Sequence, residues 1–186
     1  MSMPDLAKRW TREEVLELPD DGKRYELLDG ELLVTPSPAF VHQRAVMALY
    51  DRVSRYVNEH RVGWACQSPA DLDLRTGQLL QPDLFVVPAW QSQPQAWSEV
   101  GIPLLVAEVL SPSTAPNDRK LKRRRYQRSG VGEYWIVDTD ARLIERWRPN
   151  DERPEILLEQ IEWQPKPELP PLLLDLTDYF KEVWGE

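Results

Sequence analysis

The sequence predicts a fold of the α/β or α+β class, in which helices flank a central mixed β-sheet. Short apolar runs bounded by turn-forming residues indicate strands, and longer stretches with helical spacing lie between and after them. At 186 residues the chain has the length of one domain with a sizeable core. We therefore expect a single domain over residues 1–186, with residues 1–23 as an N-terminal appendage and residues 165–186 as a proline-rich segment and helix.

The start of the chain predicts a short helix and then a hairpin. Thr11 and Glu14 have the spacing of a capping box, in which each side chain accepts a hydrogen bond from the backbone of the other. Asp29-Gly30 is a strong signal for a tight turn, because both residue types tolerate positive φ. We therefore expect two short strands on either side of this turn, within residues 23–36.

The middle of the chain predicts a long helix and a second pair of strands. Residues 39–60 have helical periodicity, and residues 64–88 predict two strands around Thr76-Gly77. An irregular loop should follow over residues 88–103. The apolar positions of the long helix fall on one stripe: Val41, Ala45, Ala48, Leu49, Val53 and Val57.

The next region predicts a buried strand and a basic helix. Residues 104–110 are almost wholly apolar, as expected of a strand covered on both faces. The helix should follow over residues 118–128, with Asn117 or Asp118 as its cap and Gly130 at its end.

The last part of the chain predicts three strands and a helix. A hairpin is expected around Asp140, because apolar and aromatic residues flank a polar turn there. Residues 155–163 predict a further strand. A terminal helix should open at Thr177, after the proline-rich connection over residues 165–171.

Composition limits the class of protein. The net charge of −8 argues against a chain coated with positive charge for non-specific nucleic-acid binding. Residues 118–128 are the exception, because seven of them are Arg or Lys and one is acidic. Cys66 is the only cysteine, and neither a signal-peptide pattern nor an apolar run of about 20 residues is present. We therefore expect a cytoplasmic protein that does not span a membrane.

Two carboxylates lie in apolar surroundings. Glu108 is in the middle of LLVAEVL, and Asp83 follows Pro82 at the start of another apolar run. A buried carboxylate without a compensating charge is costly, and two close together repel unless a cation or a shared proton intervenes. If the two strands are neighbours, both acids converge on one point.

A hard divalent cation fits this pattern. Carboxylate oxygens are the ligands that Mg²⁺ or Mn²⁺ prefer. A third acid could come from Glu31 or Glu26, and His42 is within plausible reach at the start of the long helix. Zinc spacings, glycine-rich phosphate loops and a serine nucleophile pattern are all absent from the sequence.

Blocks of the sequence resemble the Uma2 (DUF820) family of endonucleases. The resemblance extends from about Arg24 to Asp138, with the blocks in family order, and it implies the PD-(D/E)xK, restriction-endonuclease-like fold. The implied activity is metal-dependent hydrolysis of phosphodiester bonds, in DNA. The matching blocks are YELLDGEL, SPAFVH, QPDLFVVP, EVLSPST and DRKLKRRRYQRSGVGEYWIVD.

The resemblance also implies roles for individual residues. Asp83 matches the Asp of the PD element, and Glu108 matches the acid of the ExK element. The lysine that usually stands two positions after that acid is replaced by Leu110. In the family this lysine comes instead from the next helix, which here would be Lys122, with Lys120 as the alternative.

The implied metal site uses Mg²⁺ or Mn²⁺. Asp83, Glu108 and Glu31 would hold the ion. His42 would contact one of these ligands, and not the ion itself, or would contact a phosphate. Lys122 would orient the attacking water, help to deprotonate it, or stabilise charge on the phosphate.

The basic helix predicts the contacts with nucleic acid. Arg119, Lys120 and Arg123 would bind the phosphate backbone of DNA. An alternative is a catalytically weakened nuclease fold that binds nucleic acid or a protein partner without cleavage, which Leu110 and the acidic composition favour. A homodimer is also expected by analogy with nucleases that cut both strands, and Trp90 or Trp97 could mark its interface or stack on bases.

Overall fold

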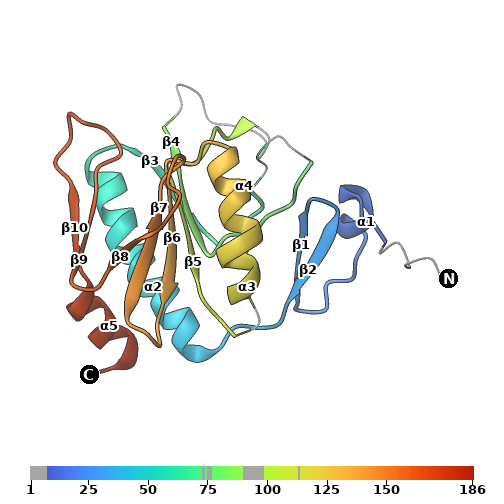
Figure 1. The fold of residues 1–186 in the computed structure, drawn as a ribbon, viewed down its shortest axis with the longest axis horizontal. Helices are drawn as coiled ribbons and strands as arrows, with labels where there is room; N and C mark the ends of the chain where they lie inside the picture. The colour runs from blue at the N-terminus through green and yellow to red at the C-terminus, as the bar shows by residue number, and fades with distance from the viewer. Residues whose placement is uncertain (1–7, 73, 75–76, 90–98, 113) are drawn as a thin grey trace.

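A six-stranded mixed sheet forms the centre of the computed structural model, which describes residues 8–72, 74, 77–89, 99–112 and 114–186. The strand order is β3-β4-β5-β6-β7-β8, and β5 and β6 are the parallel pair (Figure 1). Two hairpins, β1–β2 and β9–β10, form separate small sheets. The elements are α1 (Arg12–Leu16), β1 (Arg24–Leu28), β2 (Glu31–Thr35), α2 (Phe40–Glu59), β3 (Gly63–Gln67), β4 (Leu84–Pro88), β5 (Leu105–Val109), α3 (Ala115–Asn117), the π turn η2 (Asp118–Lys122), α4 (Arg123–Arg128), β6 (Glu133–Asp138), β7 (Leu143–Trp147), β8 (Glu155–Leu157), β9 (Gln160–Trp163), β10 (Leu172–Asp175) and α5 (Leu176–Trp184).

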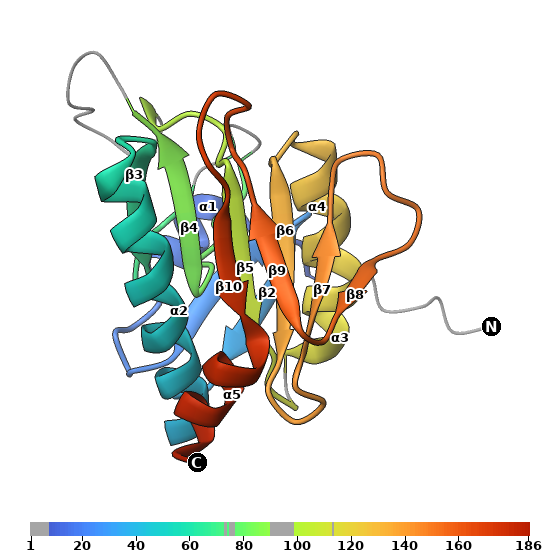
Figure 2. The ribbon, with the colours of Figure 1, turned by 90° about the vertical axis from the view of Figure 1, so that its left-hand side faces the viewer.

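Different helices cover the two faces of the sheet. α2, α5 and the β9–β10 hairpin pack on one face, called here the α2 face (Figure 2). The helical segment from α3 to α4 and the β1–β2 hairpin lie on the other, the α4 face. Since both faces are covered, the central strands are apolar at almost every position.

Alternation along the central strands decides which face each side chain enters. In β5, Leu105, Ala107 and Val109 belong to the core of the α2 face, whereas Val106 belongs to that of the α4 face. Glu108 therefore points to the α4 face, because side chains two positions apart share a face. The opposite face would have placed the carboxylate among the apolar side chains of the α2-face core.

The basic helix begins earlier than the sequence predicts. Thr114 is the N-cap, so neither Asn117 nor Asp118 caps the helix. Pro116 is tolerated because the first turn of a helix needs no backbone N–H. Asp118 lies inside the π turn and is buried, and the helix ends before Gly130, whose φ of 78° suits a left-handed C-terminal position.

Most other expected elements are confirmed, with three differences. Between β3 and β4 the chain forms an isolated bridge from Leu72 to Leu80 in place of two continuous strands. The predicted strand over 155–163 is divided into β8 and β9, and Asp175, two residues before Thr177, caps the last helix.

Some expectations concern residues that the structure does not describe. Thr76 at the expected turn and the loop tryptophans Trp90 and Trp97 lie outside the described residues. Within the described part of the chain, no helix combines the length and the apolar character needed to cross a membrane.

Candidate active site

Asp83 and Glu108 lie side by side on the α4 face. Leu84 of β4 pairs with Ala107 of β5, so the next positions along the two antiparallel segments are Asp83 and Glu108. The amide of Val109 donates a 2.8 Å hydrogen bond to Asp83 Oδ2 and ties the segments together. Asp83 is 3% exposed and Glu108 is 1% exposed. The sequence analysis expected these two acids to converge if their strands were neighbours, and in the structure they do.

Arg24 and His42 hold the carboxylate of Asp83. Arg24 Nη1 donates to Oδ1 at 2.8 Å, and His42 Nε2 lies 3.1 Å from Oδ2. Burial by itself would raise the pKa of Asp83, but His42 and Arg24 outweigh it and lower the pKa to about 2. Asp83 is therefore ionised at any pH at which the protein would work.

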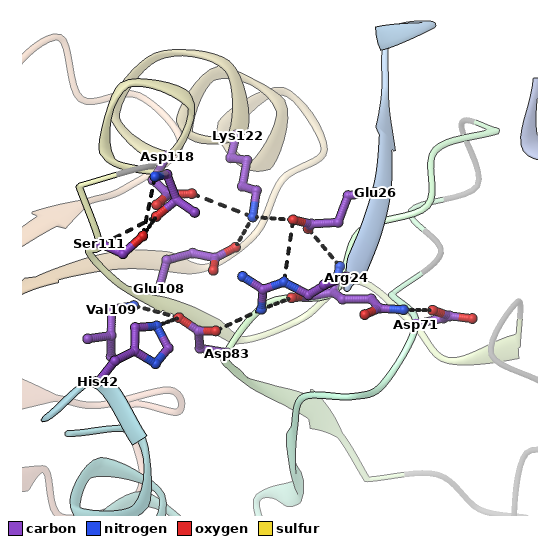
Figure 3. A network of polar contacts seen from close by, with 12 residues as sticks. Arg24, Glu26, His42, Asp71, Asp83, Glu108, Val109, Ser111, Asp118 and Lys122 are labelled. Carbon is purple, nitrogen blue, oxygen red and sulfur yellow. Dashed lines mark hydrogen bonds and ion pairs between the residues drawn. The ribbon is translucent and has the colours of Figure 1, made fainter. Parts of the chain in front are cut away.

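Lys122 is buried among three acids. Its Nζ lies 2.9 Å from Glu26 Oε2, 3.0 Å from Glu108 Oε1 and 3.5 Å from Asp118 Oδ1 (Figure 3). Burial by itself would lower the pKa of Lys122, but the three carboxylates outweigh it and raise the pKa. The side chain is therefore an ammonium group at neutral pH.

Glu108 is less fully compensated than Asp83. Its Oε1 accepts hydrogen bonds from Lys122 and, at 3.2 Å, from the hydroxyl of Tyr126. Burial is the largest influence on its pKa; Lys122 lowers the pKa, and repulsion from Asp83 adds to the effect of burial. Together these raise the pKa to about 8. Without further positive charge nearby, Glu108 holds a proton at neutral pH.

The charges of this cluster fit one divalent cation. Four buried carboxylates face Arg24 and Lys122, so with all four ionised these two cations leave two negative charges uncompensated. Carboxylate oxygens are suitable ligands for Mg²⁺ or Mn²⁺. Within the described ranges, no three His, Cys, Asp or Glu side chains are already arranged to hold a metal ion, so the fit is one of charge and donor type. The carboxylates are those of Glu26, Asp83, Glu108 and Asp118, and the two cations are Arg24 and Lys122.

The structure brings Glu26, and not Glu31, to the other acids. Glu26 lies within β1 and is fully buried, with Oε2 on Lys122 and Oε1 accepting from the amide of Gln81 at 2.9 Å. Glu31 stands opposite Leu28 at the exposed start of β2. The position inside a strand, between apolar neighbours, is the sequence signal that distinguishes the buried Glu26 from its neighbour at the turn.

Three further residues of the cluster were not predicted as part of it. Arg24 is the first residue of β1, Asp118 was expected as a possible helix cap, and Tyr126 lies in the basic helix. A sequence signal exists for two of them. Asp118 and Tyr126 stand four positions before and after Lys122, and residues four apart on a helix share a face.

A cleft reaches the cluster from outside. It has a volume of about 650 Å³, and Arg24, His42 and Asp83 are among the residues that line it. The linker before α2 and the loop after β5, with Ser111, also line it. Glu108 and Lys122, which are buried, are not among the lining residues.

The basic helix divides its cations between two uses. Arg119 forms ion pairs with Asp138 at 2.9 Å and Glu145 at 2.7 Å, and the guanidinium of Arg123 lies 4.6 Å from the ring centre of Trp147. Arg125 forms an ion pair with Asp29 of the β1–β2 hairpin. Three further cations are exposed, spaced by four, and form no ion pair with any other described residue. This outward row consists of Lys120, Arg124 and Arg128.

The mixed sheet, with an Asp, a Glu and a Lys gathered where β4 begins and β5 ends, defines a nuclease fold of the restriction-endonuclease type. Comparison with known proteins agrees. The family model Uma2, described as "Putative restriction endonuclease", matches residues 12–177, and the chain belongs to this family. Nucleases of this type generally use a divalent metal ion.

A solved structure shares the fold. It is the crystal structure of "a putative nuclease belonging to DUF820" from Anabaena variabilis ATCC 29413, with a TM-score of 0.73 and 21% sequence identity. The match covers 94% of this chain and 99% of that one. A search of curated proteins gave no match.

Proposed function

We propose that the protein is a divalent-metal-dependent endonuclease that hydrolyses phosphodiester bonds in DNA. One observation carries the proposal: Asp83 and Glu108 are neighbours on one face of the sheet, and Lys122 contacts Glu108 although Leu110 occupies the usual lysine position. The membership of the Uma2 family supports the same reaction class.

Asp83 and Glu108 are the residues proposed to hold Mg²⁺ or Mn²⁺. A bound ion would polarise the phosphate and lower the pKa of a water molecule. Glu26 supports the site through Lys122, which both acids contact. The role predicted for Glu31 at the metal has no support from its exposed position on β2.

Lys122 supplies a fixed positive charge and not a base. Its pKa is raised by three carboxylates, so its proton is held and the group acts as a hydrogen-bond donor. An ammonium group beside Glu108 can orient a water molecule or stabilise charge that develops on phosphate oxygens. Of the roles that the sequence left open, deprotonation of the water is the one that this environment disfavours.

The cleft is the proposed place of the scissile phosphate. Arg24 and His42 both contact Asp83 and both line the cleft, so both side chains lie beside the proposed metal. The N–H groups of a guanidinium and of an imidazole can donate hydrogen bonds to phosphate oxygens. His42 is thus proposed as a phosphate contact and as a support for Asp83.

The outward row is the proposed contact with the DNA backbone. Lys120, Arg124 and Arg128 are exposed and have no acidic partner among the described residues, so their charges are available to phosphates. The predicted contacts Arg119 and Arg123 are engaged with the sheet side of the helix. Of the three predicted contacts, Lys120 retains the best geometric support.

Cleavage of plasmid DNA tests the proposal. Purified protein should nick or cut plasmid with Mg²⁺ or Mn²⁺ and lose this activity in EDTA. Asp83→Asn should also lose it while remaining folded, whereas Asp51→Asn, an exposed acid on α2, should cleave like wild type. Equal activity of wild type and Asp83→Asn would mean contamination and would refute the assignment.

The same variants address the alternative of a module that binds without cleavage. In that case DNA binding would persist, with no metal-dependent product from wild type. This alternative is compatible with the contacts of Asp83, whose carboxylate already has Arg24, His42 and the amide of Val109 as partners. The homodimer stays a prediction, and light scattering of the purified protein would test it.

A further inference from the structure

The helical segment after β5 turns one row of four residues toward the sheet. These residues are spaced by four, and each is at most 8% exposed. In a regular α-helix a step of four residues drifts by about 40°, so three steps drift by about 120°. A regular helix therefore cannot keep the whole row against the sheet. The row consists of Thr114, Asp118, Lys122 and Tyr126.

The π turn η2 removes most of this drift. The amide of Arg123 donates to the carbonyl of Asp118, five residues earlier, so the turn accommodates one extra residue. One residue corresponds to about 100° of rotation. As a result Lys122 and Tyr126 both reach the same atom, Glu108 Oε1, at 3.0 and 3.2 Å.

A tyrosine of the sheet holds the π turn in place. Tyr134, on β6 and 1% exposed, donates a 3.2 Å hydrogen bond from its hydroxyl to the carbonyl of Asp118. This is the same carbonyl that accepts the π hydrogen bond from Arg123. The Tyr134 ring packs on that of Tyr126, with 4.8 Å between the ring centres. Because π turns are rare alternatives to the α form, an outside hydrogen bond at this carbonyl favours the observed form.

We propose that Tyr134 is a positioning residue for Lys122. Its hydroxyl pins the Asp118 carbonyl, holds the π turn and so keeps the ammonium group between Glu108 and Glu26. The consequence for catalysis rests on the proposed function, whereas the positioning itself does not.

The ammonium group offers a direct test by NMR. The chain has six lysines, all within its described part, and Lys122 alone is buried. Its side-chain ammonium should therefore give one exchange-protected signal in protein labelled with ¹⁵N-lysine. Tyr134→Phe keeps the ring and removes the hydroxyl, and the protected signal should broaden or disappear while the circular dichroism spectrum stays native.

Tyr179→Phe is the matched control. Tyr179 is also buried, and its hydroxyl also donates to a helix carbonyl, that of Ala45 at 2.9 Å, but it lies on the α2 face. This variant should keep the Lys122 signal. An unchanged signal in Tyr134→Phe, or equal loss in both variants, would overturn the proposal.

A measurement on wild type decides the case in which Tyr134→Phe fails to fold. Scalar coupling across the hydrogen bond should connect the Arg123 nitrogen with the Asp118 carbonyl carbon. Coupling from Lys122 in place of Arg123 would indicate a regular α turn and would overturn the proposal.

Kinetics add the catalytic consequence. With active wild type, Tyr134→Phe should lower kcat about tenfold, as expected from a loss of about one hydrogen bond's free energy. KM and the calorimetric affinity for Mn²⁺ should stay unchanged, which a general loss of structure would not produce. If wild type cleaves nothing, the proposed function fails, and the NMR measurements still decide the role of Tyr134.

Discussion

The two faces of the central sheet are built from the same strands but have different physical chemistry. On the α2 face, Leu105 and Ala107 of β5 belong to the hydrophobic core. On the α4 face, Glu108 of the same strand meets Lys122, and Asp83 meets Arg24. One strand thus contributes alternately to a hydrophobic core and to a buried ion cluster.

This difference separates stability from function along one strand. Burial of apolar surface stabilises the fold on the α2 face. On the α4 face, burial of four acids with two permanent cations costs free energy that a divalent cation would offset. We therefore expect substitutions on the α2 face of β5 to lower stability and leave activity unchanged. Substitutions on the α4 face should lower activity and not stability.

The largest effect should come from Lys122 on the α4 face. Lys122→Met removes the ammonium beside Glu108 and should lower kcat about a thousandfold, the size expected for a preorganised charge in an active site. Lys181→Met, an exposed lysine of α5, should leave kcat unchanged. The measurement is single-turnover cleavage at saturating Mn²⁺.

A second variant sharpens this prediction. Leu110 stands two positions after Glu108, so a lysine there would enter the same face. Adding Leu110→Lys to Lys122→Met should restore part of the lost activity. Full activity of Lys122→Met by itself would contradict the role of this ammonium group.

The next effect belongs to the α2 face. Leu105 is fully buried in its core, and Leu105→Ala should lower the free energy of unfolding by about 2–5 kcal/mol. Below the melting temperature, kcat and Mn²⁺ affinity should match wild type, because no ion of the cluster is touched. Chemical denaturation with parallel activity assays checks this, and a loss of kcat in fully folded protein would break the separation of the two faces.

The sequence predicts the strand-borne part of the site well. A carboxylate inside an apolar run indicates burial, and two such runs predict neighbouring strands, so Asp83 and Glu108 could be found from local pattern. The family resemblance supplied Lys122. Strand periodicity alone could not assign Glu108 to a face, since both faces are apolar.

The helical part of the site is harder to predict. Asp118 and Glu26 become part of the cluster through a π turn and through the docking of the β1–β2 hairpin, which are tertiary events. Propensity rules place Asp118 at a helix cap and treat Glu26 and Glu31 alike. The available sequence signal was the row of residues spaced by four, Thr114, Asp118, Lys122 and Tyr126. A regular α-helix cannot keep such a row on one face, so the row indicates an irregular turn.

Glu108→Gln should stabilise the metal-free protein. The pKa of Glu108 is raised from its usual 4.5 to about 8, chiefly by burial. Folding therefore favours the protonated form, whose contribution to stability is complete below pH 4.5 and is lost as the pH rises to 8. Glutamine has no such loss, so the variant should be more stable by roughly 1–3 kcal/mol near pH 8.

Melting in EDTA across pH 5 to 9 is the measurement. The difference in melting temperature between Glu108→Gln and wild type should widen with pH and level off above about pH 8. Glu145→Gln is the matched control, because Glu145 is also a buried strand acid on this sheet but pairs with Arg119 away from the cluster. A difference that stays constant with pH would contradict the charge imbalance inferred around Glu108.

The smallest effects concern the exposed surfaces of the two faces. Arg124→Gln and Arg128→Gln remove charges from the outward row, and each should weaken DNA binding several-fold at low salt. Each should also reduce the slope of log affinity against log salt by about 0.9, the value for one duplex phosphate contact. Arg55→Gln removes an exposed charge from α2, where it pairs with Asp51, and should change neither quantity. Fluorescence anisotropy in Ca²⁺, which supports binding without turnover in many nucleases, measures both; equal slopes for all three variants would show that the α4 face has no special contact with the backbone.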